Sequence, residues 1–218
     1  TGKFWAIEHW NVKPDMICMA KALSGGFVPV GAVAMTQQIM DSVFNRMDRA
    51  VVHGSTFSKN NMAMAAGLAS LEVIRAERLV EKSATTGAEI VSRINALTGQ
   101  YEFLKEARGK GSMIAIEFKS PSSLKLKAAW MMLEAANKGL FCQMITIPLF
   151  KEHRILTQVA GHGMNVVKLL PPLILNQRDV DHVLDALTQT IADTHQVPGS
   201  IWELGKNLAS HALKAKAG

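Results

Sequence analysis

A single lysine interrupts a long uncharged stretch near the start of the chain. Across residues 16–36 the only charged side chain is that of Lys21. The apolar run at residues 16–19 precedes it and is typical of a buried strand end. Gly25-Gly26 follows, and glycines adopt backbone angles that other residues avoid. The pattern therefore predicts a buried strand, then Lys21, then a tight turn.

The setting of Lys21 has a chemical consequence. An isolated ammonium group is costly to bury, so a lysine in apolar surroundings tends to lose its proton and become a nucleophile. Neutral lysine amines form Schiff bases with carbonyl compounds, above all with the aldehyde of pyridoxal phosphate. The alternative is a lysine at a strand end that extends its ammonium group into solvent.

Composition narrows the class of protein. The chain has 218 residues, of which 48% are hydrophobic and 19% charged, enough for one large domain or two small ones. Its net charge of +6 is scattered and its aromatic content is 6%, so neither a basic cluster nor a base-stacking platform is present for nucleic acid. No apolar run approaches the ~20 residues of a membrane span, and no signal-peptide pattern opens the sequence.

The cysteines and histidines show no metal-ligand spacing. Cys18 and Cys142 stand in apolar segments without a disulfide framework, which favours a reducing, cytoplasmic location. His153 and His162 also lack partners at the spacing of a metal site. We therefore expect no metal, no nucleic acid and no membrane among the partners.

Hydrophobic periodicity predicts the elements. Strands are predicted at residues 27–35, 113–118, 140–148, 154–158 and 166–170. Helices are predicted at residues 37–49, 62–82, 87–97, 121–138, 179–193 and 201–213, with Asn176 as the N-cap of the 179–193 helix. Residues 108–111 (Arg-Gly-Lys-Gly) lack the spacing of a phosphate loop and precede a strand, so they are interpreted as a structural turn.

The segment around Lys21 resembles a known family. Pro-Asp-Met-Ile-Cys-Met-Ala-Lys-Ala-Leu-Ser-Gly-Gly (residues 14–26), followed by residues 28–33, is similar to the cofactor-lysine segment of class III pyridoxal-phosphate aminotransferases. These fold-type-I enzymes include ornithine, acetylornithine and ω-amino transaminases. The resemblance implies that Lys21 is the catalytic lysine, which forms the internal aldimine with pyridoxal 5'-phosphate. It also implies an α/β fold, with residues 1–75 ending the cofactor-binding large domain and residues 76–218 forming an α+β small domain.

A second segment, His53-Gly54-Ser55-Thr56-Phe57, precedes a predicted helix. Hydroxyls and free backbone amides at that place suit a phosphate group, although a Ser or Thr could instead cap the helix. The segment resembles the family's His-Gly-x-Thr-Phe/Tyr motif, whose threonine binds the cofactor phosphate of the neighbouring subunit. The resemblance implies that Thr56, with Ser55 beside it, binds the cofactor within a homodimer of shared active sites. The usual Gly-Gly-Asn-Pro continuation is here Ser-Lys-Asn-Asn (residues 58–61).

A third segment lies near the end of the chain. Val-Val-Lys-Leu-Leu-Pro-Pro-Leu (residues 166–173) resembles the family's Arg-x-x-Pro-Pro-Leu motif, whose arginine contacts a substrate carboxylate or pairs with a glutamate. The resemblance implies substrate binding by Lys168, which keeps the charge but loses the planar bidentate fork of arginine. The alternative is a strand-end lysine that extends into water.

The resemblance implies transamination of an amino acid or an ω-amine, with an oxo-acid such as 2-oxoglutarate or pyruvate as acceptor. An aminomutase, epimerase or decarboxylase on the same scaffold is an alternative, and so is a non-catalytic interaction domain. In the family, the phosphate cup, the ring-stacking aromatic residue and the aspartate at the pyridine nitrogen lie upstream of the segment that begins at Thr1. We therefore expect this chain to be a portion of the enzyme.

Overall fold

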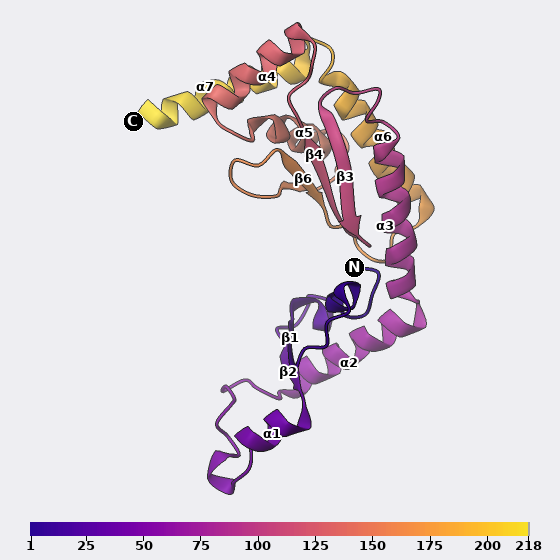
Figure 1. Ribbon diagram of the computed structural model, residues 1–218, viewed down its shortest axis with the longest axis vertical. Helices are drawn as coiled ribbons and strands as arrows, with labels where there is room; N and C mark the ends of the chain where they lie inside the picture. The colour runs from indigo at the N-terminus through magenta and orange to yellow at the C-terminus, as the bar shows by residue number, and fades with distance from the viewer. Residues whose placement is uncertain (218) are drawn as a thin grey trace. The chain divides into compact units, whose positions relative to one another are not determined.

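The computed structural model describes residues 1–217 and divides into two compact units (Figure 1). One unit is Lys3–Glu81, and the other combines Thr1–Gly2 with the chain from Lys82 onward. The boundary predicted near Arg75 is one between domains of the complete protein, which is a different division from these two compact units. It stays a prediction.

The unit Lys3–Glu81 is built around a two-stranded antiparallel sheet. Its elements are η1 (Ala6–Trp10), β1 (Met16–Ala20), η2 (Lys21–Ser24), β2 (Gly31–Met35), α1 (Gln37–Val43), η3 (Met47–Arg49) and α2 (Asn61–Ala76). Met16 of β1 pairs with Met35 of β2, and Ala20 pairs with Gly31. The 3₁₀ turn η2 packs against α2. Strand β1 thus ends where a turn held by α2 begins, and Lys21 is the first residue of that turn.

The second unit joins a four-stranded sheet to several helices. Its strands are β3 (Leu104–Lys110), β4 (Met113–Phe118), β5 (Gln158–Val159) and β6 (Val166–Leu169), in the antiparallel order β3-β4-β6-β5. Its helices are α3 (Leu79–Asn95), α4 (Leu124–Ala136), α5 (Leu140–Lys151), α6 (Gln177–Asp193) and α7 (Ser200–Ala217). Helices α4 and α7 pack side by side and both contact α5 (Figure 1). The strand predicted at 113–118 is confirmed as β4.

An aromatic cluster forms the centre of this unit. Phe103 is fully buried, and its ring lies 4.7 Å from that of Phe141, 5.9 Å from that of Trp130 and 6.0 Å from that of Trp202. The indole Nε1 of Trp202 donates a 2.9 Å hydrogen bond to the carbonyl of Thr194, so its polar atom is satisfied inside the core. The cluster therefore ties α4, α5 and α7 to the strand that begins just after Phe103.

The strand predicted at residues 140–148 is wrong, because this segment forms helix α5. Seven of its residues are buried: Leu140, Phe141, Cys142, Met144, Ile145, Pro148 and Leu149. A helix buried on most of its sides has a continuous apolar sequence, which periodicity cannot distinguish from a buried strand. Pro148, the last residue of the predicted strand, lies inside the helix.

Two predicted helices have different boundaries from those observed. The pattern predicts helices at 62–82 and 87–97, whereas the structure has α2 ending at Ala76 and α3 running from Leu79 to Asn95. The break falls at Glu77 and Arg78, and Arg78 has a left-handed backbone with φ of 51°. No glycine or proline marks the break, so the sequence gives no local signal for it.

Other boundaries shift in ways that local chemistry explains. The strand predicted at 27–35 is confined to β2, because Gly25-Gly26 has positive φ and the nearby Pro29 has no backbone donor. The helix predicted at 37–49 ends at Val43. The strand predicted at 154–158 is wrong for residues 154–157, because β5 is Gln158–Val159 and shares only Gln158 with it. Residues Arg108 to Lys110, predicted as a turn, end strand β3, and Gly111 makes the turn with φ of 53°.

The helix predicted at 179–193 is confirmed as α6, with Asn176 as its N-cap. The Asn176 side chain accepts a 3.1 Å hydrogen bond from the backbone of Asp179. The Asp179 carboxylate in turn accepts a 3.0 Å bond from the backbone of Asn176, which completes a capping box.

Candidate active site

The backbone of Lys21 is unusual. Its φ is 54°, in the left-handed region, and Ala20 before it is fully extended with φ of −161° and ψ of −165°. A residue with a Cβ in the left-handed region costs about 1–2 kcal/mol. Such strain persists only where the surroundings hold it, and it is common at functional sites. This backbone supports a functional role for Lys21.

The side chain of Lys21 is exposed, and the buried strand expected before it is not found in the described chain. No residue of β1 is buried, because β1 pairs with β2 alone in a two-stranded sheet. Within residues 1–217 no hydrogen bond or ion pair is recorded for the Lys21 amine. The amine is therefore available for a covalent partner.

The turn after Lys21 is closed by a buried serine that the sequence did not single out. Ser24 is only 3% exposed, and its hydroxyl donates to the carbonyl of Val28. The same hydroxyl accepts a 3.3 Å hydrogen bond from the backbone N–H of Val28. Gly25 and Gly26 lie inside the closed loop with φ of 66° and 84°. A serine directly before two glycines is the sequence feature from which this contact could have been predicted.

Ser55 and Thr56 lie in an exposed turn before α2. The turn is closed by Ser58, whose hydroxyl donates a 2.8 Å hydrogen bond to the Ser55 carbonyl. Asn60 is the N-cap of α2, since its side chain accepts a 2.9 Å bond from the backbone of Ala63. The capping alternative for Ser55 and Thr56 is therefore wrong. No hydrogen bond joins either residue to Lys21 within the described chain.

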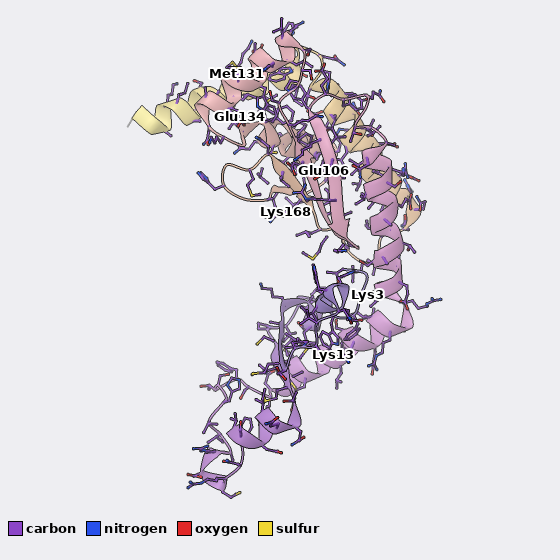
Figure 2. All side chains as sticks on the ribbon, viewed as in Figure 1. Lys3, Lys13, Glu106, Met131, Glu134 and Lys168 are labelled. Atoms are coloured by element: carbon purple, nitrogen blue, oxygen red, sulfur yellow. The ribbon has the colours of Figure 1, made fainter. Side chains whose placement is uncertain are left out.

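Lys168 lies on β6 in the other unit (Figure 2). It pairs with Ala115 of β4 and Gln158 of β5, and Ala115 pairs in turn with Arg108 of β3. Residues directly opposite in a sheet share a face. Lys168 is half-buried on this face. Its ammonium group offers a single positive charge and hydrogen-bond donors at this position.

Other charges on this face form a small network around Glu117. Lys105 lies 2.6 Å from the Glu117 carboxylate, and Arg108 binds both Glu117 and, at 3.0 Å, Glu106. The hydrogen bond from Lys105, followed by that from Arg108, lowers the pKa of Glu117 below its ordinary value. The face is therefore ionised and polar, in contrast to the apolar face formed by Ile114, Ile116 and Phe118.

No group of three or more His, Cys, Asp or Glu side chains between residues 1 and 217 is arranged to hold a metal ion. Burial raises the pKa of the Cys142 thiol to about 12, so this cysteine is inert at neutral pH. Cys18 is exposed. Within the same residues no helix has both the length and the apolar character needed to cross a membrane.

A groove of about 550 Å³ lies between α4 and α7, away from the predicted site residues. Its lining includes Met132, Leu213 and Lys206, and it contains neither Lys21, Thr56 nor Lys168. Lys21, Ser55 and Thr56 stay predicted site residues of the unit Lys3–Glu81, and Lys168 stays a predicted substrate residue of the other unit.

Comparisons with known proteins define the class. The structure is similar to that of an acetylornithine aminotransferase from Elizabethkingia anophelis, with a TM-score of 0.67 and 31% identity over 88% of this chain and 44% of that one. It is also similar to an ornithine aminotransferase from Toxoplasma gondii, with a TM-score of 0.72 and 26% identity over 89% of this chain and 41% of that one. The fold is therefore that of part of a fold-type-I aminotransferase.

Sequence comparison gives the family. A family model described as Aminotransferase class-III matches residues 1–191, so the chain belongs to the class III aminotransferases. An ornithine aminotransferase from Oceanobacillus iheyensis is 33% identical over 88% of this chain and 41% of its own length. The chain spans between 26% and 41% of the length of such curated relatives. Helix α7 lies beyond the matched residues.

Enzymes of this family depend on pyridoxal phosphate. The described residues fit that cofactor. Lys21 offers an exposed amine on a strained backbone at a strand end, and Ser55 and Thr56 offer exposed hydroxyls just before the N-terminus of α2. These are the groups that covalent attachment and phosphate binding require.

Proposed function

We propose that the protein containing this chain is a pyridoxal-phosphate-dependent aminotransferase. It transfers the amino group of an amino acid or ω-amine to an oxo-acid, and Lys21 is its catalytic residue. The observation that carries the proposal is the left-handed backbone of Lys21 at the end of β1, within a segment that the family model matches. A screen of amino donors with 2-oxoglutarate or pyruvate on the full-length protein tests it. Amine transfer to neither acceptor from any amino acid or ω-amine would contradict it.

Lys21, Ser55 and Thr56 have different roles in the proposed reaction. Bound pyridoxal phosphate supplies an aldehyde for attachment and a ring that accepts the electron pair released when the donor loses its Cα proton. The Nζ of Lys21 would hold the cofactor covalently through that aldehyde carbon. When not attached, the same Nζ would act as the general acid and base that moves the proton of the donor Cα. The hydroxyls of Thr56 and Ser55 donate hydrogen bonds to phosphate oxygens.

We propose a cytoplasmic location, supported by two free cysteines without a disulfide framework. A relative from Arabidopsis thaliana, named as a mitochondrial alanine–glyoxylate aminotransferase homologue, is 32% identical over 88% of this chain and 37% of its own length. Fractionation of the source cells, with an antibody to detect the protein, distinguishes a cytoplasmic from a mitochondrial location.

Thr56→Ala is expected to weaken cofactor binding. The loss of one hydrogen bond to a charged phosphate costs roughly 1.5–3 kcal/mol, so the dissociation constant for pyridoxal phosphate should rise about tenfold or more. Titration of the cofactor-free protein measures it. Thr36→Ala is the matched control, because Thr36 is also exposed and makes no side-chain capping bond to α1. Equal constants for both variants would remove Thr56 from the phosphate site.

The proposed homodimer allows a second test of Thr56, which we place in the site of the neighbouring subunit. A heterodimer of Lys21→Ala and Thr56→Ala subunits then has one site lacking both groups and one intact site. We expect that intact site to bind the cofactor with wild-type affinity. If Thr56 acts within its own subunit, one site lacks Lys21 and the other lacks Thr56, so verified heterodimers will have no site with wild-type affinity.

Lys168 is proposed to bind a substrate carboxylate as a point charge. A lysine lacks the fork that fixes a carboxylate in one orientation, so we expect tolerance of donors with a neutral far end. Lys168→Met keeps the long stem and removes the charge. It should lower kcat/KM about tenfold for carboxylate-bearing substrates and leave neutral amines nearly unchanged. Lys110→Met is the control on an exposed strand end of the same sheet. An equal decrease for both substrate classes would contradict a carboxylate-binding role.

A further inference from the structure

We propose that Ser24 is a positioning residue that holds Lys21 in its strained, reactive orientation. This inference rests on the proposed function of Lys21 and extends it to a residue that does not touch the substrate. Ser24 is the only buried residue of the η2 turn. Lys21, at the other end of the same turn, is exposed.

The Ser24 hydroxyl makes two hydrogen bonds. A serine hydroxyl has one donor and can accept as well, and here both capacities are used on a single residue. The hydroxyl donates to the carbonyl of Val28 and accepts from the N–H of Val28, with the latter N···O distance at 3.3 Å. The Ser24 side chain is thereby bound to both backbone polar groups of Val28, its N–H and its C=O.

These two hydrogen bonds restrict a loop that contains two adjacent glycines. Gly25 and Gly26 lie between the two fixed residues, and glycine has the widest range of backbone angles. The remaining bonds of the loop are between backbone groups: Gly25 N–H to the Ala22 carbonyl at 3.0 Å, and Phe27 N–H to the Ser24 carbonyl at 3.4 Å. Without the hydroxyl, these two bonds alone would hold a segment containing two adjacent glycines.

Lys21 is the first residue of the turn that Ser24 ends. The left-handed backbone of Lys21 is unfavourable for a residue with a Cβ, so it relaxes unless its neighbours hold it. The turn that starts at Lys21 packs against α2, and the carbonyl of Leu23 lies close to Gly67 on that helix. Ser24 is thus the buried side chain that fixes the end of the turn. A change of φ at Lys21 would re-aim its Cα–Cβ bond and move the amine.

Ser24→Ala in the full-length protein with its cofactor tests the proposal. Alanine removes the hydroxyl without adding volume, so the fold should be retained in far-UV circular dichroism. We expect kcat to fall about tenfold while KM changes by less than about twofold, because chemistry at Lys21 suffers more than substrate binding. We also expect a shifted pH midpoint of the cofactor's visible absorption band, which reports the nitrogen of Lys21.

Two further variants separate positioning from general loosening. Ser24→Thr keeps the hydroxyl and should restore both kcat and the pH midpoint towards wild type. Ser70→Ala makes the same chemical change on α2, where Ser70 faces Gly25 without a recorded hydrogen bond among residues 1–217. It should leave both quantities within about twofold of wild type.

The outcomes are distinct. A wild-type pH midpoint and kcat in Ser24→Ala, or equal losses in Ser24→Ala and Ser70→Ala, would overturn the proposal while leaving Lys21 as the catalytic lysine. The second readout is the fraction of Lys21 that carries pyridoxal phosphate after borohydride reduction. We expect this fraction to be lower in Ser24→Ala than in the wild-type protein. If wild-type Lys21 is not modified at all, the proposed function itself fails and the role of Ser24 falls with it.

Discussion

Replacement of Lys21 by alanine is expected to reduce transamination to background in the full-length protein. The substitution removes both the covalent attachment and the group that moves the Cα proton. General acid–base catalysis alone contributes about 10²–10⁴-fold, so the loss in kcat should be at least roughly 10³-fold. Stopped-flow measurement of the first half-reaction with excess donor isolates this step from acceptor binding.

A matched control for this prediction is Lys13→Ala. Lys13 is an exposed lysine in the loop before β1, in the same compact unit (Figure 2). The control removes the same charge and the same side-chain length. It should retain near wild-type kcat, and a comparable loss in both variants would show that net charge or folding is responsible. Substantial activity in Lys21→Ala would contradict the assignment of Lys21.

Phe103→Ala should cause the largest loss of stability in the unit from Lys82 onward. Phe103 is fully buried and its ring contacts four others, those of Trp130, Phe141, His195 and Trp202. Truncation of a buried phenylalanine costs about 3–5 kcal/mol, since it removes apolar contact and leaves a cavity. Equilibrium urea unfolding measures the free energy of unfolding. The fluorescence of Trp130 and Trp202 reports on this unit.

The control for Phe103 is Phe150→Ala on helix α5. Phe150 is 58% exposed, so the same truncation leaves no enclosed cavity and should cost less than about 1 kcal/mol. A loss below about 1 kcal/mol for Phe103→Ala, or equal losses for the two variants, would contradict the central place of the aromatic cluster.

Elements with an amphipathic pattern and a local end signal could be predicted from the sequence. Strand β4 alternates buried and less buried residues, and helix α6 has an asparagine cap followed three residues later by an aspartate. Helix α5 has no such pattern, because tertiary burial on most sides removes the polar face that would reveal its period. The break between α2 and α3 depends on the left-handed backbone at Arg78, which no breaker residue announces.

Some features of the candidate site could be predicted from the sequence, and others could not. Lys21 stands out because its sequence neighbours are uncharged, and the glycine pair after it predicts a turn. The sequence could not show that Lys21 itself adopts the left-handed conformation, or that the Ser24 hydroxyl closes the turn. Those features depend on contacts with Val28 and α2, which a residue pattern does not encode. The roles of Lys21, Ser55, Thr56 and Lys168 remain predictions.

Borohydride reduction of the cofactor-bound, full-length protein tests the central claim most directly. Reduction makes the link between pyridoxal phosphate and its lysine permanent, and mass spectrometry of the peptides then locates it. The account predicts the added mass on the peptide that contains Lys21, and no stable addition in the Lys21→Ala variant. Modification of another lysine, such as Lys59 in the loop beside Thr56, with Lys21 left free, would contradict the account.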